Sequence, residues 1–368
     1  MVSRIEKYLQ DVALLPGLAG FEGKVAAYMT AEFERLGLKV EEDTMGNIIT
    51  KVEGTDPEAP VIMVFAHMDS LGFMVKYIEE DGFLRIERLG GIPEKVLPST
   101  EVVVGCKNGT YLPGLIGCKS HHVTPAEEKY VVNKYGTLFV DIGAKSREEV
   151  FALGIDVGSP IVYKPKYQKL LNDRAYLSFS DNRSGCASLL ELANTLQENP
   201  RPSTVYIVAS VQEEYNLRGA MVASRTVKPD IAICIDGGTG HDTPDTEGSG
   251  HVMVGGGAAM WLYTFHGRGT LNGTISHPAM IRLFDEAAER MGHRMQRMAS
   301  IGGLTDSSYV QLEGTGVKAI DVMFPGRYAH TPCELVDLND LESVTKVIKE
   351  VVDNIDANTD FSRNCSYI

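Results

Sequence analysis

The sequence has few of the features that mark membrane, secreted or nucleic-acid-binding proteins. No stretch approaches the roughly 20 apolar residues of a membrane span, and the charged segment MVSRIEKYLQDVALL lacks the apolar core of a signal peptide. Basic residues are outnumbered, because 35 Lys and Arg against 49 Asp and Glu give a net charge of −14. Nucleic acid and anionic membranes both require a basic patch, so we expect neither as a partner.

Cysteine and tryptophan are also sparse. The six cysteines form no CxxC pair and no tight framework spacing, which favours buried free thiols over a disulfide scaffold. A reducing cytoplasm is therefore the expected location. The single tryptophan, Trp261, argues against a sugar-binding groove, since such a groove normally offers several aromatic platforms. The hydrophobic content of 43% is ordinary for a globular protein.

The 368 residues show two kinds of hydrophobic pattern in different parts of the chain, which suggests a large domain and a smaller one. Residues 1–69 and 170–368 alternate helical periodicity with β-branched apolar runs, and this pattern predicts an α/β domain with a mixed, largely parallel sheet flanked by helices. Residues 70–169 instead contain short strand-like segments separated by the hairpin dipeptides Asp81-Gly82 and Asn108-Gly109. We therefore predict a β-rich barrel or sandwich inserted into the larger domain.

The periodicity also places the individual elements. It predicts strands over 39–41, 47–52, 61–66, 73–78, 83–88, 101–104, 110–115, 177–180, 205–211, 231–235, 260–266, 294–299 and 318–323. It predicts two helices within 3–37, and further helices over 146–153, 184–196, 218–225, 274–291, 306–312 and 338–355. A glycine-rich loop is expected over 237–257.

Acidic and imidazole side chains follow the apolar strands of the larger domain. In chain order they are His67, Asp69, Asp181, Glu213, Glu214, Asp236 and His330. An isolated Glu-Glu pair is usually a solvated acidic turn, but chemistry in open α/β sheets lies just beyond the strand ends. So many carboxylates converging on one edge would need cations. Nitrogen and oxygen ligands without thiolate suit zinc, cobalt or manganese.

Five segments give the chain a family resemblance: AHMDSLGFMV, SFSDNRSGCA, QEEYNLRGA, IDGG and PGRYAHTPCE. In this order they resemble the cellulase-M-like glutamyl aminopeptidases, which are dinuclear metallopeptidases with a zinc-exopeptidase-like fold. The resemblance covers nearly the whole chain and is weakest over 105–140. It implies two divalent metal ions per subunit, and it implies that the insert 70–169 mediates dimerisation. It also implies that dimers can build a tetrahedral dodecamer.

The resemblance implies a role for each strand-end residue. His67 and Asp236 match the ligands of one metal, and Glu214 and His330 match those of the other. Asp181 matches the carboxylate that bridges both metals, and Asp69 matches the carboxylate that orients the imidazole of His67. Glu213 matches the general base.

These assignments lead to one preferred function and three alternatives. We expect an aminopeptidase that releases the N-terminal residue of short peptides by a water activated between two metals, with Glu213 as general base. A metal-dependent deacylase of small amides is the closest alternative. A glycoside hydrolase could use paired carboxylates but needs no histidine ligands. A non-catalytic assembly protein predicts a broken ligand set, whereas every expected ligand is present.

Four further side chains have open roles at this stage. His121 and His122 lie in the predicted insert, where a surface loop is the simpler interpretation and a contact with a neighbouring subunit's site the sharper one. His241, in the glycine-rich loop, is more typical of a polar loop residue than of a ligand. Arg327 could bind a substrate carboxylate or carbonyl, or it could pair with an acid of the site.

Overall fold

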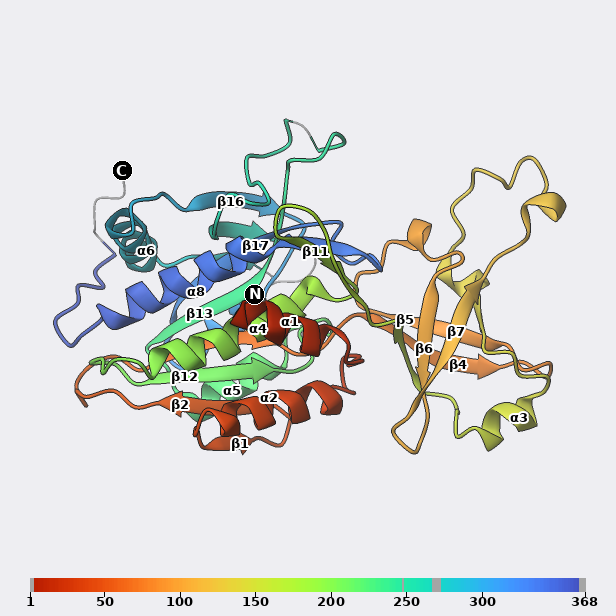
Figure 1. The fold of residues 1–368 in the computed structure, drawn as a ribbon, viewed down its shortest axis with the longest axis horizontal. Helices are drawn as coiled ribbons and strands as arrows, with labels where there is room; N and C mark the ends of the chain where they lie inside the picture. The colour runs from red at the N-terminus through yellow and green to blue at the C-terminus, as the bar shows by residue number, and fades with distance from the viewer. Residues whose placement is uncertain (1–2, 247, 267–272, 364–368) are drawn as a thin grey trace.

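The chain folds into a large sheet-and-helix unit with a smaller barrel joined to one side of it (Figure 1). The computed structural model describes residues 3–246, 248–266 and 273–363. None of the helices in these ranges combines the length and the apolar character that crossing a membrane demands. Cys365, for which a free thiol is predicted, lies outside the described residues.

The large sheet is mixed, as predicted. Within the described residues it contains twelve strands, and its main path runs in the order β1 (Val40–Glu42), β2 (Ile48–Val52), β12 (Val205–Ser210), β3 (Ile62–His67), β13 (Ile231–Thr239), β17 (Lys318–Arg327), β18 (Glu334–Asp337), β11 (Arg174–Leu177) and β10 (Tyr167–Lys169). The other three strands are β14 (Ala259–Phe265), β15 (Gly273–Ile275) and β16 (Gln296–Ile301). Parallel pairing occupies the centre, β12-β3-β13-β17, and also joins β14 to β16.

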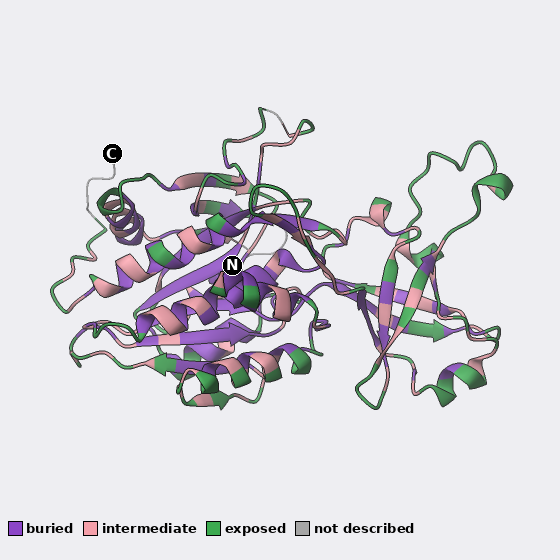
Figure 2. Ribbon diagram, in the orientation of Figure 1, coloured by how far each residue is buried: buried purple, intermediate pink, exposed green. Residues whose placement is uncertain are grey.

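Helices bury both faces of the central strands. Successive side chains of a strand point to opposite faces, and in β3 Val64 belongs to one apolar cluster while Met63 and Phe65 belong to another. The first cluster also contains residues of α1 (Arg4–Ala13), α2 (Gly23–Arg35), α4 (Ser180–Leu196), α6 (Pro278–Arg290) and α8 (Leu338–Asp353). The second contains residues of α5 (Gly219–Val227) and α7 (Ser307–Val310). Figure 2 shows the resulting concentration of buried residues in the sheet.

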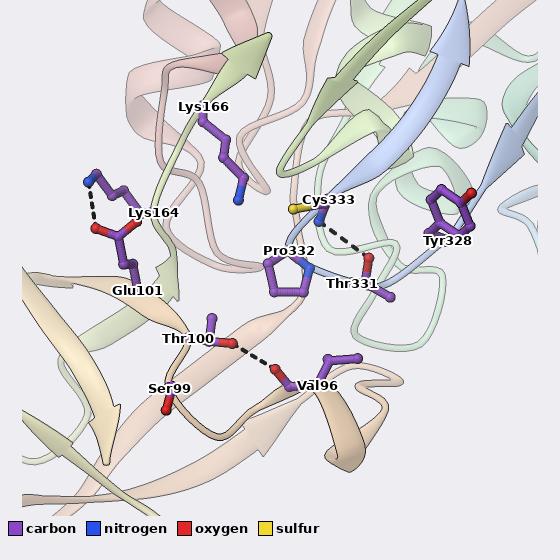
Figure 3. A pocket seen from close by; sticks show the side chains of 10 residues that line it. All are labelled: Val96, Ser99, Thr100, Glu101, Lys164, Lys166, Tyr328, Thr331, Pro332 and Cys333. Atoms are coloured by element: carbon purple, nitrogen blue, oxygen red, sulfur yellow. Dashed lines mark hydrogen bonds and ion pairs between the residues drawn. The ribbon is translucent and has the colours of Figure 1, made fainter. Parts of the chain in front are cut away.

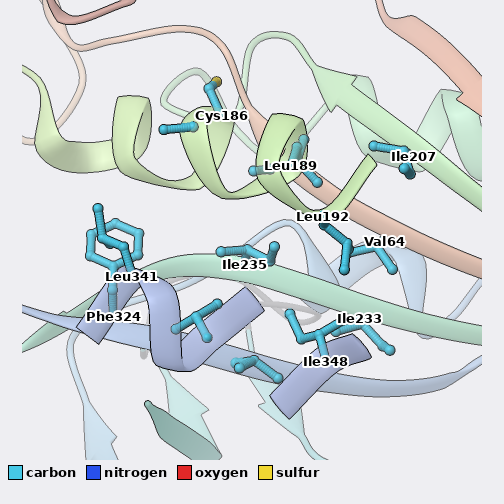
Figure 4. Close-up of a cluster of buried hydrophobic side chains, with 14 of the residues drawn as sticks. Val64, Cys186, Leu189, Leu192, Ile207, Ile233, Ile235, Phe324, Leu341 and Ile348 are labelled. Atoms are coloured by element: carbon cyan, nitrogen blue, oxygen red, sulfur yellow. The ribbon is translucent and has the colours of Figure 1, made fainter. Parts of the chain in front are cut away.

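The packing of α4 and α8 follows from their sequences. Figure 4 shows Leu189 and Leu192 of α4, spaced one helical turn apart, together with Leu341 and Ile348 of α8 and Ile233 of the sheet. Apolar residues at this spacing form one stripe along a helix. Each stripe therefore packs against the sheet. Together the two helices hold the ends of the central strands in place.

The insert forms a closed antiparallel barrel. Of the two architectures predicted from the sequence, a barrel and a sandwich, the barrel is therefore the correct one. Six described strands close it in the order β4 (Gly72–Ile78), β5 (Leu84–Leu89), β8 (Phe139–Asp141), β7 (Tyr111–Gly117), β6 (Glu101–Gly105) and β9 (Pro160–Tyr163). The unit also holds α3 (Arg147–Ala152) and the short 3-10 helices η1 (Glu94–Val96), η2 (His121–Val123) and η3 (Tyr135–Thr137). A separate apolar cluster, including Phe73, Val104 and Val140, fills its interior.

Several element boundaries differ from the sequence predictions. The predicted helix over 274–291 begins only at Pro278, behind the N-cap His277, because Thr274 and Ile275 pair with β14 instead. Strands β13 and β17 continue together to Thr239 and Arg327, since they pair along their whole length. Strands β8, β9, β10 and β18 have no counterpart among the predictions; each contains only three or four residues, too few for a clear alternating pattern.

Candidate metal centre

Six of the seven strand-end residues come together in two adjacent groups. In the first group, ligand atoms of His67, Glu213 and Asp236 all lie within 4.8 Å of one another. In the second, ligand atoms of Asp181, Glu214 and His330 do the same.

The carboxylate of Asp181 lies between the two groups. Its Oδ1 is 3.0 Å from Nε2 of His67, and its Oδ2 is 3.4 Å from Nε2 of His330. Nε2 of His67 also lies 3.9 Å from a carboxylate oxygen of Glu213 and of Asp236. One carboxylate that faces two imidazoles with its two oxygens has the arrangement needed to bridge two cations.

Asp181 owes its position to the start of α4. The Asp181-Asn182 peptide bond is cis, and both residues have non-helical backbone angles. The Asn182 side chain donates to the carbonyl of Ile235 at 2.8 Å and accepts from the amide of Gly185 at 2.9 Å. A Cβ at Gly185 would lie 2.1 Å from the Asn182 Oδ1 atom, so only glycine allows this close approach.

Asp69, the seventh residue, lies behind the two groups and is fully buried. Its carboxylate accepts the backbone amides of Glu213 at 2.9 Å and Glu214 at 3.0 Å. It also lies 3.5 Å from Nδ1 of His67, although the main-chain carbonyl of Asp69 is closer to that atom, at 3.1 Å. Asp69 thus positions the Glu213-Glu214 turn as well as the imidazole.

The centre carries more negative charge than the protein itself compensates. Burial raises the pKa of Glu213 and Asp236 well above the usual range and that of Glu214 to about 7, and neighbouring carboxylates add to each shift. Burial alone would lower the pKa of His67, but its hydrogen bonds to Asp181 and Asp69 hold the pKa well above the usual value. The buried Oε1 of Glu214 has no hydrogen-bond partner among the described residues. A divalent cation fits this set of donors.

Two further carboxylates belong to the site and are missed by the strand-end argument. Glu334 is buried; its Oε2 accepts the amide of Asp181 at 2.9 Å, and its Oε1 accepts the amide of His330. It therefore holds Asp181 and His330 together through their backbones. Asp306, also buried, accepts the hydroxyl of Ser210 at 2.9 Å. The only available signal for Glu334 was its place at the end of PGRYAHTPCE.

The barrel contributes directly to the position of His330. The residue has a left-handed backbone, with φ of 64°, and its Nδ1 lies 2.7 Å from the carbonyl oxygen of Gly91, which follows β5. This contact fixes the ring so that Nε2 faces Asp181. His330 therefore belongs to the sheet unit, but a backbone carbonyl of the insert orients its ring.

The side chains with open roles lie elsewhere. His121 and His122 are exposed on η2, and neither belongs to a metal-type group among the described residues. His241 lies against Gly250 within its loop. Arg327 donates to both carboxylate oxygens of Asp242, with 2.9 Å between its Nε and Oδ1, so it pairs with an acid of the glycine-rich loop and not with a member of either metal-type group.

Arg183 supports the centre from behind and provides a stability test. This fully buried guanidinium donates to the carbonyls of Met68 and Leu15. Arg183→Met should lower the free energy of unfolding by about 2–4 kcal/mol, because one buried and one part-buried carbonyl lose their donor. Denaturant melts would measure this. Arg290→Met, which removes a half-exposed ion pair, should cost about 1 kcal/mol or less, and an equal loss in both variants would contradict the argument.

Comparison with known proteins agrees with this geometry. The putative aminopeptidase SgcX of Escherichia coli (strain K12) is 37% identical over 331 residues, which cover 90% of this chain and 88% of that protein. The aminopeptidase APDkam598 of the archaeon Desulfurococcus kamchatkensis superposes with a TM-score of 0.90 at 31% identity, covering 96% of both chains. The TET1 peptidase of Pyrococcus horikoshii superposes with a TM-score of 0.83 at 27% identity, covering 95% of this chain and all of that one.

The family profile described as M42 glutamyl aminopeptidase matches residues 46–347. This stretch begins before the first group of the centre and ends beyond the second, so it includes both. The match confirms the resemblance carried by the five sequence segments. The chain belongs to the M42 glutamyl aminopeptidase family and is a hydrolase of the aminopeptidase type.

Proposed function

We propose that this protein is a metal-dependent aminopeptidase that removes the N-terminal residue of short peptides, with Glu213 as general base. The observation that carries the proposal is the placement of Asp181 between two three-residue groups of metal-type side chains. An acidic centre of this kind also attracts the α-ammonium group of a peptide and orients its N-terminus.

The donors suit two divalent ions. His67, Asp236 and Asp181 would hold one, and Asp181, Glu214 and His330 would hold the other. Zinc matches nitrogen and oxygen donors best, while cobalt or manganese could replace it. When bound, the pair would acidify a water molecule and polarise the scissile carbonyl.

Glu213 is placed to move protons. Its backbone amide is held by Asp69 and its carboxylate lies 3.9 Å from the ring of His67. Without metal, burial and the neighbouring carboxylates raise its pKa well above that of a solvated glutamate. We assign Glu213 to accept the proton of the attacking water and to deliver it to the leaving amine.

A peptide panel tests this function. Short peptides with free and with acetylated N-termini would be offered after chelation and again after adding zinc, cobalt or manganese. We expect metal-restored release of single residues from free N-termini only. Activity confined to the acetylated peptides would move the assignment to a deacylase, and the panel would also rank the preferred N-terminal residue.

The same proposal extends to assembly and location. We assign residues 70–169, which include all the barrel strands, to dimerisation, and residues 1–69 with 170–368 to catalysis. Since the TET1 peptidase of P. horikoshii can assemble into a tetrahedron or a large octahedral shell, we propose a homo-oligomer here, with dimers closing into a dodecamer. The five described cysteines are free, which suits the reducing cytoplasm that we propose as the location.

A further inference from the structure

A cavity lies where the barrel meets the sheet unit. Its volume is about 480 Å³, and Figure 3 shows the side chains around it. The lining residues come from the segment before β6, the link from β9 to β10, and the loop between β17 and β18: Val96, Ser99, Thr100, Glu101, Lys164, Lys166, Tyr328, Thr331, Pro332 and Cys333.

This cavity is lined in part by the loop that carries His330. Tyr328 and Thr331 line it, and His330 of the second metal-type group lies between them in the chain. The same loop therefore borders the cavity and carries a side chain of the centre. A volume in the range of 300–1,000 Å³ accommodates a small molecule rather than a single side chain, so the cavity has room for more than one residue of a peptide.

The cavity also carries one uncompensated positive charge. Lys164 pairs with Glu101 at 2.7 Å. Lys166 forms no ion pair within residues 3–246, 248–266 and 273–363, and its ammonium lies 5.9 Å from the centre of the Tyr176 ring. Figure 3 shows Lys166 reaching toward the loop of Pro332 and Cys333. Most of the charges in this chain are negative, since its net charge is −14. The unpaired ammonium group of Lys166 is therefore a suitable partner for an anion.

Arg327, the other cation considered for substrate binding, is already occupied. Its guanidinium makes two hydrogen bonds to the carboxylate of Asp242, so binding a substrate carboxylate would first require breaking that pair. Lys166 needs no such exchange. Lys166 is therefore available to bind a substrate carboxylate and Arg327 is not, although both lie close to the loop that carries His330.

We propose that this cavity binds the leaving part of a short peptide and that Lys166 pairs with its C-terminal carboxylate. The proposal rests on the aminopeptidase function and narrows its substrates. A dipeptide or tripeptide has its carboxylate near the scissile bond, whereas a longer chain carries it out of reach. The protein should therefore prefer the shortest peptides with a free C-terminus to the same peptides ending in an amide.

The test compares a neutral dipeptide with its amidated form on the metal-loaded enzyme. We expect the wild type to show a kcat/KM about tenfold higher for the free carboxylate, as for a hydrogen bond to a charged group. Lys166→Glu should abolish this ratio, mostly through KM, and Lys166→Arg should retain most of it. Lys145→Glu, which makes the same charge change at an exposed position of the barrel, should leave the ratio unchanged.

Three results would overturn the proposal. One is a carboxylate preference that survives Lys166→Glu, and another is an equal loss in Lys145→Glu. The third is an effect of Lys166→Glu only on peptides with an acidic N-terminal residue, which would assign the cavity to that side chain instead.

Absence of turnover would be a different outcome. If the wild type cleaved neither dipeptide, the peptide panel would still decide the aminopeptidase function, and the cavity could be tested separately by calorimetric titration with the same two compounds. Tighter binding of the free carboxylate that is lost in Lys166→Glu would support the anion site. Equal binding of the two compounds would refute it.

Discussion

Glu213→Gln should lower kcat by a factor of about 10²–10⁴ while leaving the metal content of the protein unchanged. Glutamine keeps the size of the side chain, and the backbone amide that Asp69 holds is not altered. What the substitution removes is the group that takes a proton from water. Steady-state kinetics on a cleaved peptide and metal analysis of the same sample would give the two numbers.

The control for this experiment is Glu58→Gln, which makes the same chemical change at an exposed position and should leave kcat unaltered. Unchanged turnover in Glu213→Gln would refute the general-base assignment. Loss of turnover together with loss of metal would mean that Glu213 acts chiefly as a ligand, an outcome that its place in the first metal-type group makes worth testing.

Metal uptake by the chelated protein should release protons, and its affinity should rise steeply with pH. Neighbouring carboxylates outweigh burial and hold the pKa of His67 and His330 well above the usual value, so both imidazoles are protonated near pH 7 without metal. A ligand must lose its proton to bind. Because each ion displaces one imidazole proton, the affinity for each ion should increase by at least about 10-fold per pH unit until the pKa of that imidazole is passed.

Two measurements check this prediction. Titration of zinc into the chelated protein in two buffers of different ionisation enthalpy gives the number of protons released, and competition with a chelator at several pH values gives the slope. His330→Gln should lower the proton count by about one. A slope near zero would show that the histidines are already neutral in the metal-free protein.

The sequence predicts much of the centre because of one physical regularity. Parallel strands β3 and β12 end at the same edge of the sheet, while β13 runs past it to Thr239, and the polar residues that follow the apolar runs of these strands converge there. His67, Glu213 and Asp236 could therefore be grouped from their positions after apolar runs. The barrel could likewise be anticipated from hairpin dipeptides and from the lack of helical periodicity.

Other parts of the site leave no such pattern. The sequence predicts Asp181 directly after a strand over 177–180, but that strand, β11, ends at Leu177 and Asp181 lies in the kinked start of α4. Glu334 acts through backbone amides that no spacing rule relates to it. The cavity around Lys166 forms only where two units meet. These features depend on tertiary packing, which periodicity along one chain does not encode.

The contact between Gly91 and His330 has a consequence for how this protein can be divided. The barrel is not a detachable appendage, because the carbonyl of Gly91, which follows β5, fixes one of the imidazoles of the sheet unit. Excising the insert, or exchanging it for a barrel from another protein, would leave that imidazole without its acceptor. The barrel and the sheet unit should therefore be kept together whenever the protein is engineered or studied.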